Sequence, residues 1–304
     1  RRTRRRRLPT HVKLAPRNPE QIDYVIANGS ECEPYITCDD QLMRTQSNGI
    51  VEGLRLVLRL FPNARGVIAI EDNKPEAIEA MTHACEGDAN LSVLPVMAKY
   101  PEGGERNLIG VVTGRQLRFG QLPADLGCVV CNVSTLNAIY RAVCKTEPLM
   151  GRLFTVSGDA VANPHTLFVR IGTSCSELLE AAGGIKPGSE ARKILCGGPM
   201  MGIAMSTLDA PVAKNNNALT VLASDEVELA EQQMTACLRC GRCGHVCPIG
   251  LVPQMMAEAA ERQDYERYEK KLYGLDCIAC GSCTYICPAK RPLMQLFKQT
   301  KAVI

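Results

Sequence analysis

Two stretches, CLRCGRCGHVCP at residues 237–248 and CIACGSCTYICP at residues 277–288, share one pattern. Each has four cysteines spaced C-x2-C-x2-C-x3-C, followed directly by proline, and the two begin forty residues apart. This spacing lets one loop bring three thiolates around a cubane iron–sulfur cluster, with the fourth thiolate serving a second cluster. Gly241 and Gly281 allow the backbone to approach closely. The repeat therefore predicts two [4Fe-4S] clusters.

The eight repeat cysteines divide into two interleaved sets, because the fourth cysteine of each run serves the other cluster. The first set is Cys237, Cys240, Cys243 and Cys287, and the second is Cys247, Cys277, Cys280 and Cys283. The alternative is two structural zinc sites, since zinc also takes four thiolates. Zinc ribbons usually pair two C-x2-C knuckles across a long gap, whereas here each group of four is compact and duplicated, so the spacing favours iron.

The composition narrows the class of protein. The chain has 304 residues, 16 cysteines, five phenylalanines and no tryptophan, and it contains no run of eighteen apolar residues that would span a bilayer. Without the six arginines among residues 1–7, 29 basic residues stand against 32 acidic ones. We therefore expect no nucleic-acid partner. The cysteines outside the repeats, including the pair Cys128 and Cys131, are expected to be mostly small buried apolar side chains.

Residues 20–150 alternate strand-like and helical patterns. DYVIANGS at 23–30, ARGVIAIED at 64–72, LSVLPVMAKY at 91–100 and LGCVVCNVST at 126–135 are predicted strands. GIVEGLRLVLRLF at 49–61 and KPEAIEAMTHAC at 74–85 have the spacing of helices. Strands alternating with helices predict a parallel sheet, in which ligands bind beyond the carboxyl ends of the strands.

Polar, glycine-containing stretches follow three of these strands. They are ANGSECEPYITCDDQLMR at 27–44, KYPEGGERNLI at 99–109 and CNVSTLNAIYRAV at 131–143. Their polar residues include Asn28, Glu31, Glu33, Asp39, Asp40, Tyr100, Glu105, Asn132, Ser134 and Thr135. Each stretch alone indicates a turn or a helix cap. Three such strand ends upstream of two clusters favour a flavin site, because a helix start suits a phosphate.

The remaining segments complete a three-domain plan. RLFTVSGDAVANPHTLFVRIGTSCSELLEAAGG at 152–184 predicts two strands and a short helix, and ILCGGPMMG at 194–202 a further strand and a glycine turn. We expect an α/β flavin- and nucleotide-binding domain at 9–150 and a small α+β domain of β-grasp type at 151–210. A polar connector at 211–232 then leads to a helical, ferredoxin-like domain with two [4Fe-4S] clusters at 233–304.

Taken together, these motifs resemble one family. PTHVKL, NGSECEPYIT, DDQLMR, EDNKPEA, KYPEGGE, LPADLG, NVSTLNAIYRAV, GGPMMG and both cysteine repeats resemble the C subunit of the Rnf (Rsx) ion-translocating electron transport complex, over residues 8 to about 299. That subunit is related to the flavin- and NADH-binding subunit of respiratory complex I. The resemblance implies electron transfer between NAD(H) and the other subunits of a membrane-bound complex, with ferredoxin reached indirectly. It also implies a peripheral position on the cytoplasmic side of the bacterial inner membrane.

The resemblance further implies FMN as a cofactor and NAD(H) as a substrate. It implies seven contacts with these molecules, from Lys13, Asn28, Glu33, Tyr100, Glu105, Asn132 and Thr135. Lys13 approaches a phosphate of the flavin or the nucleotide, and Asn28 and Glu33 touch the isoalloxazine and the nicotinamide side. Tyr100 and Glu105 line the nucleotide pocket. Asn132 and Thr135 hold polar atoms of the flavin. Complex I relatives have an acidic residue at the position of Ser30 and an asparagine at that of Cys131, so hydrogen bonds to the flavin differ here.

Two other functions are compatible with the same sequence. One is a cobalamin reductase of the same architecture, which shares many of these motifs. The other is a non-enzymatic electron carrier whose clusters load while its flavin site is lost. Flavin content and reduction of a dye by NADH separate this carrier from an NADH-linked oxidoreductase.

The arginine-rich start, RRTRRRRL at residues 1–8, stands where the family has a glycine-rich loop that cradles phosphate and flavin. A GC-rich codon set for VGLGGAGFPT, read in a shifted frame, yields RRTRRRRLPT. We therefore expect an aberrant, frameshifted leader in an N-terminally truncated chain with weakened flavin-dependent activity. The alternatives are an arm for nucleic acid or for anionic lipid.

Overall fold

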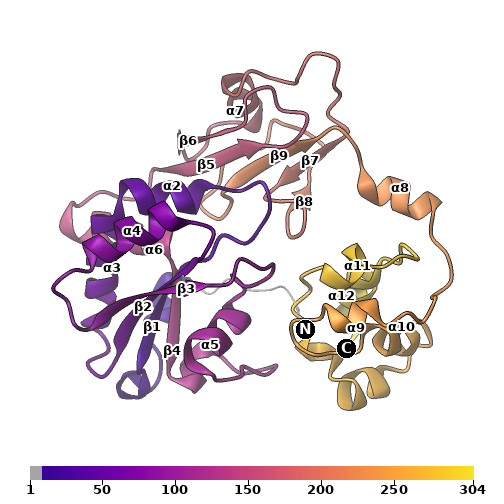
Figure 1. Cartoon of the computed structure of the whole chain (residues 1–304), viewed down its shortest axis with the longest axis horizontal. Helices are drawn as coiled ribbons and strands as arrows, with labels where there is room; N and C mark the ends of the chain where they lie inside the picture. The colour runs from indigo at the N-terminus through magenta and orange to yellow at the C-terminus, as the bar shows by residue number, and fades with distance from the viewer. Residues whose placement is uncertain (1–8) are drawn as a thin grey trace. The chain divides into compact units, whose positions relative to one another are not determined.

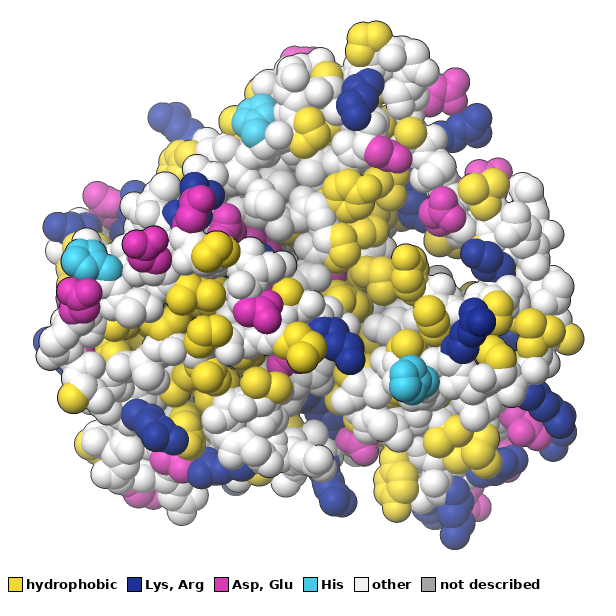
Figure 2. All heavy atoms as spheres, viewed as in Figure 1, with side chains coloured by type: hydrophobic (Ala, Val, Ile, Leu, Met, Phe, Trp, Pro, Cys, Tyr) yellow, Lys and Arg dark blue, Asp and Glu magenta, His cyan; other side chains and the backbone are white. Residues whose placement is uncertain are grey.

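The computed structural model describes residues 9–304, so the leader predicted at residues 1–8 lies outside the described residues. The described chain forms two compact units, one ending at Ala223 and one covering Ser224–Ile304 (Figure 1). On the face shown in Figure 2, basic and acidic side chains are interspersed with exposed apolar ones.

The first unit contains a parallel four-stranded sheet, as the alternating pattern predicts. Its strands are β1 (Tyr24–Gly29), β2 (Arg65–Glu71), β3 (Leu91–Val96) and β4 (Cys128–Asn132), in the order β3-β2-β1-β4. Asn28 at the end of β1 pairs in register with Asn132 at the end of β4. The polar stretches that follow these two strands therefore start side by side at the carboxyl edge of the sheet.

Helices cover both faces of this sheet (Figure 1). The described elements are α1 (Thr10–Lys13), η1 (Pro19–Gln21), α2 (Cys38–Thr45), α3 (Ser47–Leu58), α4 (Pro75–Ala84), α5 (Glu105–Thr113), η2 (Pro123–Leu126) and α6 (Val133–Cys144). Leu54, Met81 and Leu136 bring α3, α4 and α6 into one buried core on one face. Leu108 and Ile109 of α5 pack on the other face. Two buried faces explain the almost continuously apolar strands.

A second, mixed sheet of five strands completes this unit. It consists of β5 (Gly151–Ser157), β6 (His165–Arg170), β7 (Lys193–Cys196), β8 (Ile203–Ala204) and β9 (Ala218–Leu222), in the order β6-β5-β9-β7-β8. Helix α7 (Cys175–Ala181) packs on it and begins with a capping box formed by Ser174 and Glu177. The strands and the helix predicted within residues 152–202 are present.

The connector predicted at 211–232 is wrong in its first half. Strand β9 lies between β5 and β7 and is almost fully buried, so the second sheet extends past residue 210 and has this strand near its centre. The helix α8 (Glu226–Gln232) occupies the rest of the segment. The strand is difficult to predict from the sequence, because only five residues, ALTVL, have a β-type pattern and the polar run KNNN directly precedes them.

The two sheets share a small core and several hydrogen bonds. Ile36, Cys38 and Ala218 form a buried cluster, against which Leu153 packs. The Thr37 backbone N–H donates to Thr155 Oγ1 at 3.1 Å, and Ser157 Oγ donates to the Tyr35 carbonyl at 2.6 Å. The loop between β1 and α2 is therefore held by both sheets.

The second unit is helical, as predicted. After α8 it contains α9 (Arg242–His245), α10 (Pro253–Glu261), the π-helical turn η3 (Arg267–Lys271), η4 (Gly274–Asp276), α11 (Ser282–Tyr285) and α12 (Leu293–Val303). Met256, Tyr268 and Phe297 are fully buried at its centre. Among residues 9–304, no helix has both the length and the apolar character needed to cross a membrane.

Replacing Gly53 by alanine should destabilise the first unit. A Cβ atom at Gly53 would lie 2.0 Å from the Leu136 carbonyl oxygen, where α3 meets the backbone of α6. Because backbone cannot rotate away as a side chain does, we expect Gly53→Ala to lower the free energy of unfolding by about 1–3 kcal/mol in urea titrations.

Gly110 in α5 is the matched control. The nearest atom to a Cβ there is the Arg115 carbonyl oxygen at 3.7 Å, an ordinary contact. We expect Gly110→Ala to be neutral or to stabilise by up to about 1 kcal/mol, because alanine is the better helix former. Equal effects of the two substitutions would contradict the close approach of α3 and α6.

Candidate functional site

The two cysteine repeats have the same backbone conformation. Gly241 and Gly281 both have positive φ, 76° and 87°, and each is followed directly by a one-turn helix, α9 or α11. Two residues earlier, Arg239 and Ala279 also have positive φ, 54° and 53°. A side chain there is strained, so its occurrence at both equivalent positions marks a required loop shape. The sequence repeat is therefore a structural repeat.

The loops direct backbone amides at cysteine sulfur. The N–H of Arg239 donates to Cys237 Sγ at 3.4 Å, and the N–H of Ala279 donates to Cys277 Sγ at 3.3 Å. Donors of this kind stabilise a thiolate and bear on the reduction potential of a cluster that the thiolate ligates. The first cysteine of each repeat therefore accepts the same backbone hydrogen bond.

Thiols from both repeats gather around one pocket. Cys247 of the first repeat lines it together with Cys277, Cys280 and Cys283 of the second, and with apolar side chains that include Met256 and Phe297. Burial raises the pKa of Cys283 to about 12, and the neighbouring cysteines Cys277, Cys280 and Cys247 contribute to this rise. Such thiols give up their protons when a metal supplies positive charge.

The other repeat cysteines are more exposed. Cys237 and Cys240 are exposed, and Cys243 and Cys287 are half-buried. Burial raises the pKa of Cys243, with a smaller contribution from negative charge on Cys287, so these two thiols of different repeats lie near each other. Both gatherings of thiols therefore combine residues of the two repeats.

In the first unit, the carboxyl ends of β1 and β4 carry a network of amides and carboxylates. Asn132 caps α6, because its Oδ1 accepts from the Ser134 N–H at 2.8 Å. Its Nδ2 donates to Asp39 Oδ2 at 2.7 Å and to the Asn28 carbonyl at 3.4 Å. Asn132 therefore joins α6, α2 and β1, and both of its amide hydrogens are in use.

Asn28 ties the loop after β1 to the loop after β3. Its Nδ2 donates to the Gly103 carbonyl at 2.9 Å, and its Oδ1 accepts from the Ser30 N–H at 3.0 Å. A Cβ atom at Gly103 would lie 2.3 Å from the Ser30 carbonyl oxygen, so only glycine fits this crossing. The glycines of KYPEGGE thus serve the close approach of two loops.

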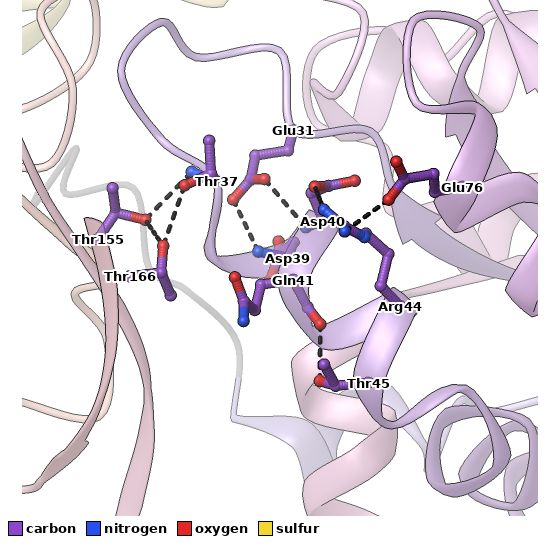
Figure 3. A network of polar contacts seen from close by, with 10 residues as sticks. All are labelled: Glu31, Thr37, Asp39, Asp40, Gln41, Arg44, Thr45, Glu76, Thr155 and Thr166. Atoms are coloured by element: carbon purple, nitrogen blue, oxygen red, sulfur yellow. Dashed lines mark hydrogen bonds and ion pairs between the residues drawn. The ribbon is translucent and has the colours of Figure 1, made fainter. Parts of the chain in front are cut away.

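Glu31 closes the loop between β1 and α2 (Figure 3). Its Oε1 accepts from the Asp39 N–H at 2.8 Å and its Oε2 from the Asp40 N–H at 3.1 Å, so the carboxyl group caps the first turn of α2. Burial raises the pKa of Glu31 to about 7, and the charge of Asp39 adds to this, while the two backbone N–H groups oppose it. Burial also raises the pKa of Asp39, against the hydrogen bond from Asn132.

Lys13 and Glu105, which lie 92 residues apart, form an ion pair. Lys13 Nζ is 2.6 Å from Glu105 Oε1 and also donates to the Val130 carbonyl at 3.2 Å. Glu105 begins α5, where a carboxylate is favoured by the helix dipole. The structure thus brings together two predicted site residues at the edge of β4.

The three other predicted residues lie in the loop after β1, in the loop after β3 and in α6. Glu33 faces the glycine turn of the second sheet, because its Oε1 accepts from the N–H groups of Met200 and Met201 at 2.7 and 2.9 Å. Tyr100 precedes a cis proline, Pro101. Thr135 lies half-buried in the first turn of α6. Glu33 therefore connects the two sheets, a contact that its position in the sequence does not indicate.

Two buried polar atoms in this region have no hydrogen-bond partner within residues 9–304. They are Ser30 Oγ and Glu102 Oε1, one in the loop after β1 and one in the loop after β3. Buried polar groups are nearly always paired, so these two atoms are positions that a polar ligand would satisfy. A hydroxyl group and a carboxyl oxygen at this edge fit the polar ring edge of a flavin.

Sequence reasoning missed the buried charges behind the site. Glu71, at the end of β2, is 2% exposed and pairs with Lys74 at 3.0 Å. The charge of Lys74 acts on both Glu31 and Asp39. The motif EDNKPEA contains both partners, yet a carboxylate next to a lysine on a turn is common. The burial of the Glu71 carboxylate comes from its place in the sheet, which the motif does not indicate.

Three domain families match consecutive parts of the chain. They are the Nuo51 FMN-binding domain at residues 5–141, the SLBB domain at residues 153–204 and the 4Fe-4S dicluster domain at residues 236–292. The order of the matches agrees with the three-domain plan predicted from the sequence.

Similar proteins include C subunits of ion-translocating complexes. The chain is 43% identical over 294 residues to the C subunit of the proton-translocating ferredoxin:NAD(+) oxidoreductase complex of Clostridium ljungdahlii, covering 97% of this chain and 63% of the relative. It is 42% identical to the Na(+)-translocating counterpart of Acetobacterium woodii, covering 97% and 66%. The C subunit of the ion-translocating oxidoreductase complex of Haemophilus influenzae is 43% identical, covering 97% and 45%. The chain thus spans less than two thirds of these relatives.

Solved structures show the same fold at lower identity. A NAD+-reducing [NiFe]-hydrogenase in the H2-reduced state matches with a TM-score of 0.64 and 22% identity, covering 97% of this chain and 59% of that chain. The air-oxidised state gives 0.65 and 18%, with the same coverage. These matches extend through all three parts of the chain.

The cap formed by Glu31 should make stability depend on pH. Folded Glu31 keeps its proton up to about pH 7, whereas an unfolded glutamate ionises near 4.5. The folded chain therefore binds more protons between these values, and the free energy of unfolding falls as the pH rises through them, by up to about 1.4 kcal/mol per pH unit. We expect Glu31→Gln to flatten this decline in urea titrations at pH 5, 6 and 7.

The exposed Glu20 in η1 provides the control for this measurement. Glu20→Gln removes a carboxyl group from the same unit without touching α2, and should keep the decline of the unaltered chain. A Glu31→Gln variant with an unchanged decline would contradict the burial of a protonated carboxyl group at the start of α2.

Proposed function

Because the chain is homologous, over 97% of its length, to the C subunits of ion-translocating oxidoreductase complexes, we propose that it is an electron-transfer subunit of such a complex. It passes electrons between NAD(H) and the other subunits, with ferredoxin reached indirectly. In this proposal it binds as a peripheral subunit on the cytoplasmic side of the bacterial inner membrane. The observation that carries the proposal is the duplicated cysteine loop, whose thiols gather across the two repeats.

The cluster ligands follow from that gathering. Cys247, Cys277, Cys280 and Cys283 hold one [4Fe-4S] cluster, and Cys237, Cys240, Cys243 and Cys287 hold the other. The pocket supports the set that contains Cys247, because all four of its cysteines line that pocket. The proximity of Cys243 and Cys287 supports the other set. The domain boundaries are 9–150, 151–223 and 233–304, with the second extended to include β9.

The carboxyl edge of the first sheet holds FMN and NAD(H). FMN, when bound, supplies the step between a two-electron hydride donor and a one-electron acceptor. Lys13 keeps one ammonium hydrogen for a phosphate, since Glu105 and the Val130 carbonyl use the other two. Asn28 likewise keeps one amide hydrogen beside its bond to Gly103.

The other proposed residues act in two ways. Asn132 positions β1 and α2, because its amide hydrogens are already used. Glu33 holds the turn at Met200 and Met201 against the loop after β1. Tyr100 and Glu105 line the nucleotide pocket in this proposal, and Thr135 holds polar atoms of the flavin. The buried atoms Ser30 Oγ and Glu102 Oε1 supply further polar contacts.

Metal and flavin analysis of the anaerobically reconstituted chain tests this function. We expect about eight iron and eight sulfide per chain, bound FMN, and reduction of ferricyanide by NADH. About two zinc in place of iron would contradict electron transfer. Iron without flavin or NADH activity would favour a carrier function over the dehydrogenase function.

Substitution of the fourth cysteine of each repeat tests the interleaved ligand sets. Cys247→Ala should remove about half of the iron and the same electron paramagnetic resonance (EPR) signal as Cys280→Ala, because both residues belong to one set. Cys287→Ala should instead remove the signal that Cys240→Ala removes.

Cys144→Ala is the control, since Cys144 is exposed and lies outside the repeats. It should retain all of the iron. If Cys247→Ala and Cys240→Ala remove the same signal, each repeat holds its own cluster and the interleaved assignment is wrong.

A further inference from the structure

Tyr268 is a fully buried side chain at the centre of the helical unit. It lies in the π-helical turn η3, and its ring packs near that of Phe297, with the centroids 6.2 Å apart. A Cβ atom at Gly274 would lie 2.2 Å from the ring, so the chain at η4 has no room for any larger residue beside it. The packing fixes where the hydroxyl group points.

That hydroxyl group has no hydrogen-bond partner within residues 9–304. A buried hydroxyl gives up its hydrogen bonds with water, and leaving it unpaired opposes folding. Phenylalanine would fill the same space without this penalty. A tyrosine at this position therefore indicates a partner that the polypeptide itself does not supply.

The ring of Tyr268 lies in a buried cluster with cysteines of the repeats. Cys283 belongs to this cluster, and Cys243, Cys247 and Cys277 pack against it. Of these, Cys247, Cys277 and Cys283 also line the pocket described above. A phenol is protonated at neutral pH and donates a hydrogen bond.

We propose that the Tyr268 hydroxyl donates a hydrogen bond to a sulfur atom of the cluster held by Cys247, Cys277, Cys280 and Cys283. This bond raises the reduction potential of that cluster. Reduction adds negative charge to the cluster sulfurs, so a donor stabilises the reduced state more than the oxidised state. The inference rests on the proposed function, because it needs a [4Fe-4S] cluster in this pocket.

A positive charge beside Cys277 also raises the reduction potential of this cluster in the proposal. Lys301 of α12 donates from Nζ to the carbonyls of Leu275 and Cys277, both at 2.6 Å. Cys237 and Cys240 of the other ligand set, by contrast, are exposed to solvent. Tyr268 and Lys301 therefore offset the effect of burial, which disfavours the added electron.

Redox titration of the full reconstituted chain, followed by EPR, tests the proposal with Tyr268→Phe. This variant keeps the ring and its packing against Phe297. At the midpoint potential of the unaltered cluster, we expect its reduced-to-oxidised ratio to fall about tenfold, which is a shift of about 59 mV for a one-electron couple. The cluster with Cys237 and Cys240 should keep its potential.

Tyr285→Phe is the matched control. Tyr285 belongs to the second repeat, between Cys283 and Cys287, and it is 79% exposed. Loss of its hydroxyl group should leave both potentials unchanged. If Tyr268→Phe leaves both potentials unchanged, or shifts the two clusters equally, the proposal is wrong.

A second variant tests the proposal if Tyr268→Phe fails to retain the cluster. 3,5-Difluorotyrosine at position 268 keeps the hydroxyl group and makes it the stronger acid and donor, so the potential should shift upward. A downward shift or no shift would overturn the proposal. Failure of the proposed function is distinguishable, since it appears as an absence of iron, whereas failure of this inference appears as two clusters with unmoved potentials.

Discussion

In the proposed function, the helical unit depends on one constraint, the need to bring four thiols to the corners of a single cluster. Each cysteine loop turns twice through the left-handed region, at Arg239 and Gly241 or at Ala279 and Gly281, and in this proposal it supplies three of the thiols. The fourth thiol then comes from the other repeat. The two loops therefore have to pack together, and α10, η3 and α12 form the core that holds them.

In the first unit, too, the polar side chains of the candidate site hold helices, strands and loops together within the polypeptide. Asn132 caps α6, holds Asp39 and contacts β1, and Glu31 caps α2 from the loop after β1. Glu33 reaches the turn of the second sheet. A ligand at this edge would thus bind to loops whose shape the polypeptide already determines.

Local signals made much of this structure predictable. The cysteine loops and the strands of the parallel sheet could be predicted from spacing and periodicity. Strand β9 was not predicted, because its five residues follow a polar run. The contacts of Glu31 and Glu33 and the burial of the Tyr268 hydroxyl group could not be predicted in this way. These features join segments distant in sequence or depend on burial, and neither leaves a local pattern in a single sequence.

In the proposed function, thiols from both repeats ligate each of two clusters, so that the chain transfers single electrons. Anomalous diffraction at the iron edge from crystals of the reconstituted chain would locate the metal directly. We expect two groups of iron, one bounded by Cys247, Cys277, Cys280 and Cys283 and one by Cys237, Cys240, Cys243 and Cys287. Single metal ions at zinc positions, or a cluster bounded by the four cysteines of one repeat, would contradict this proposal.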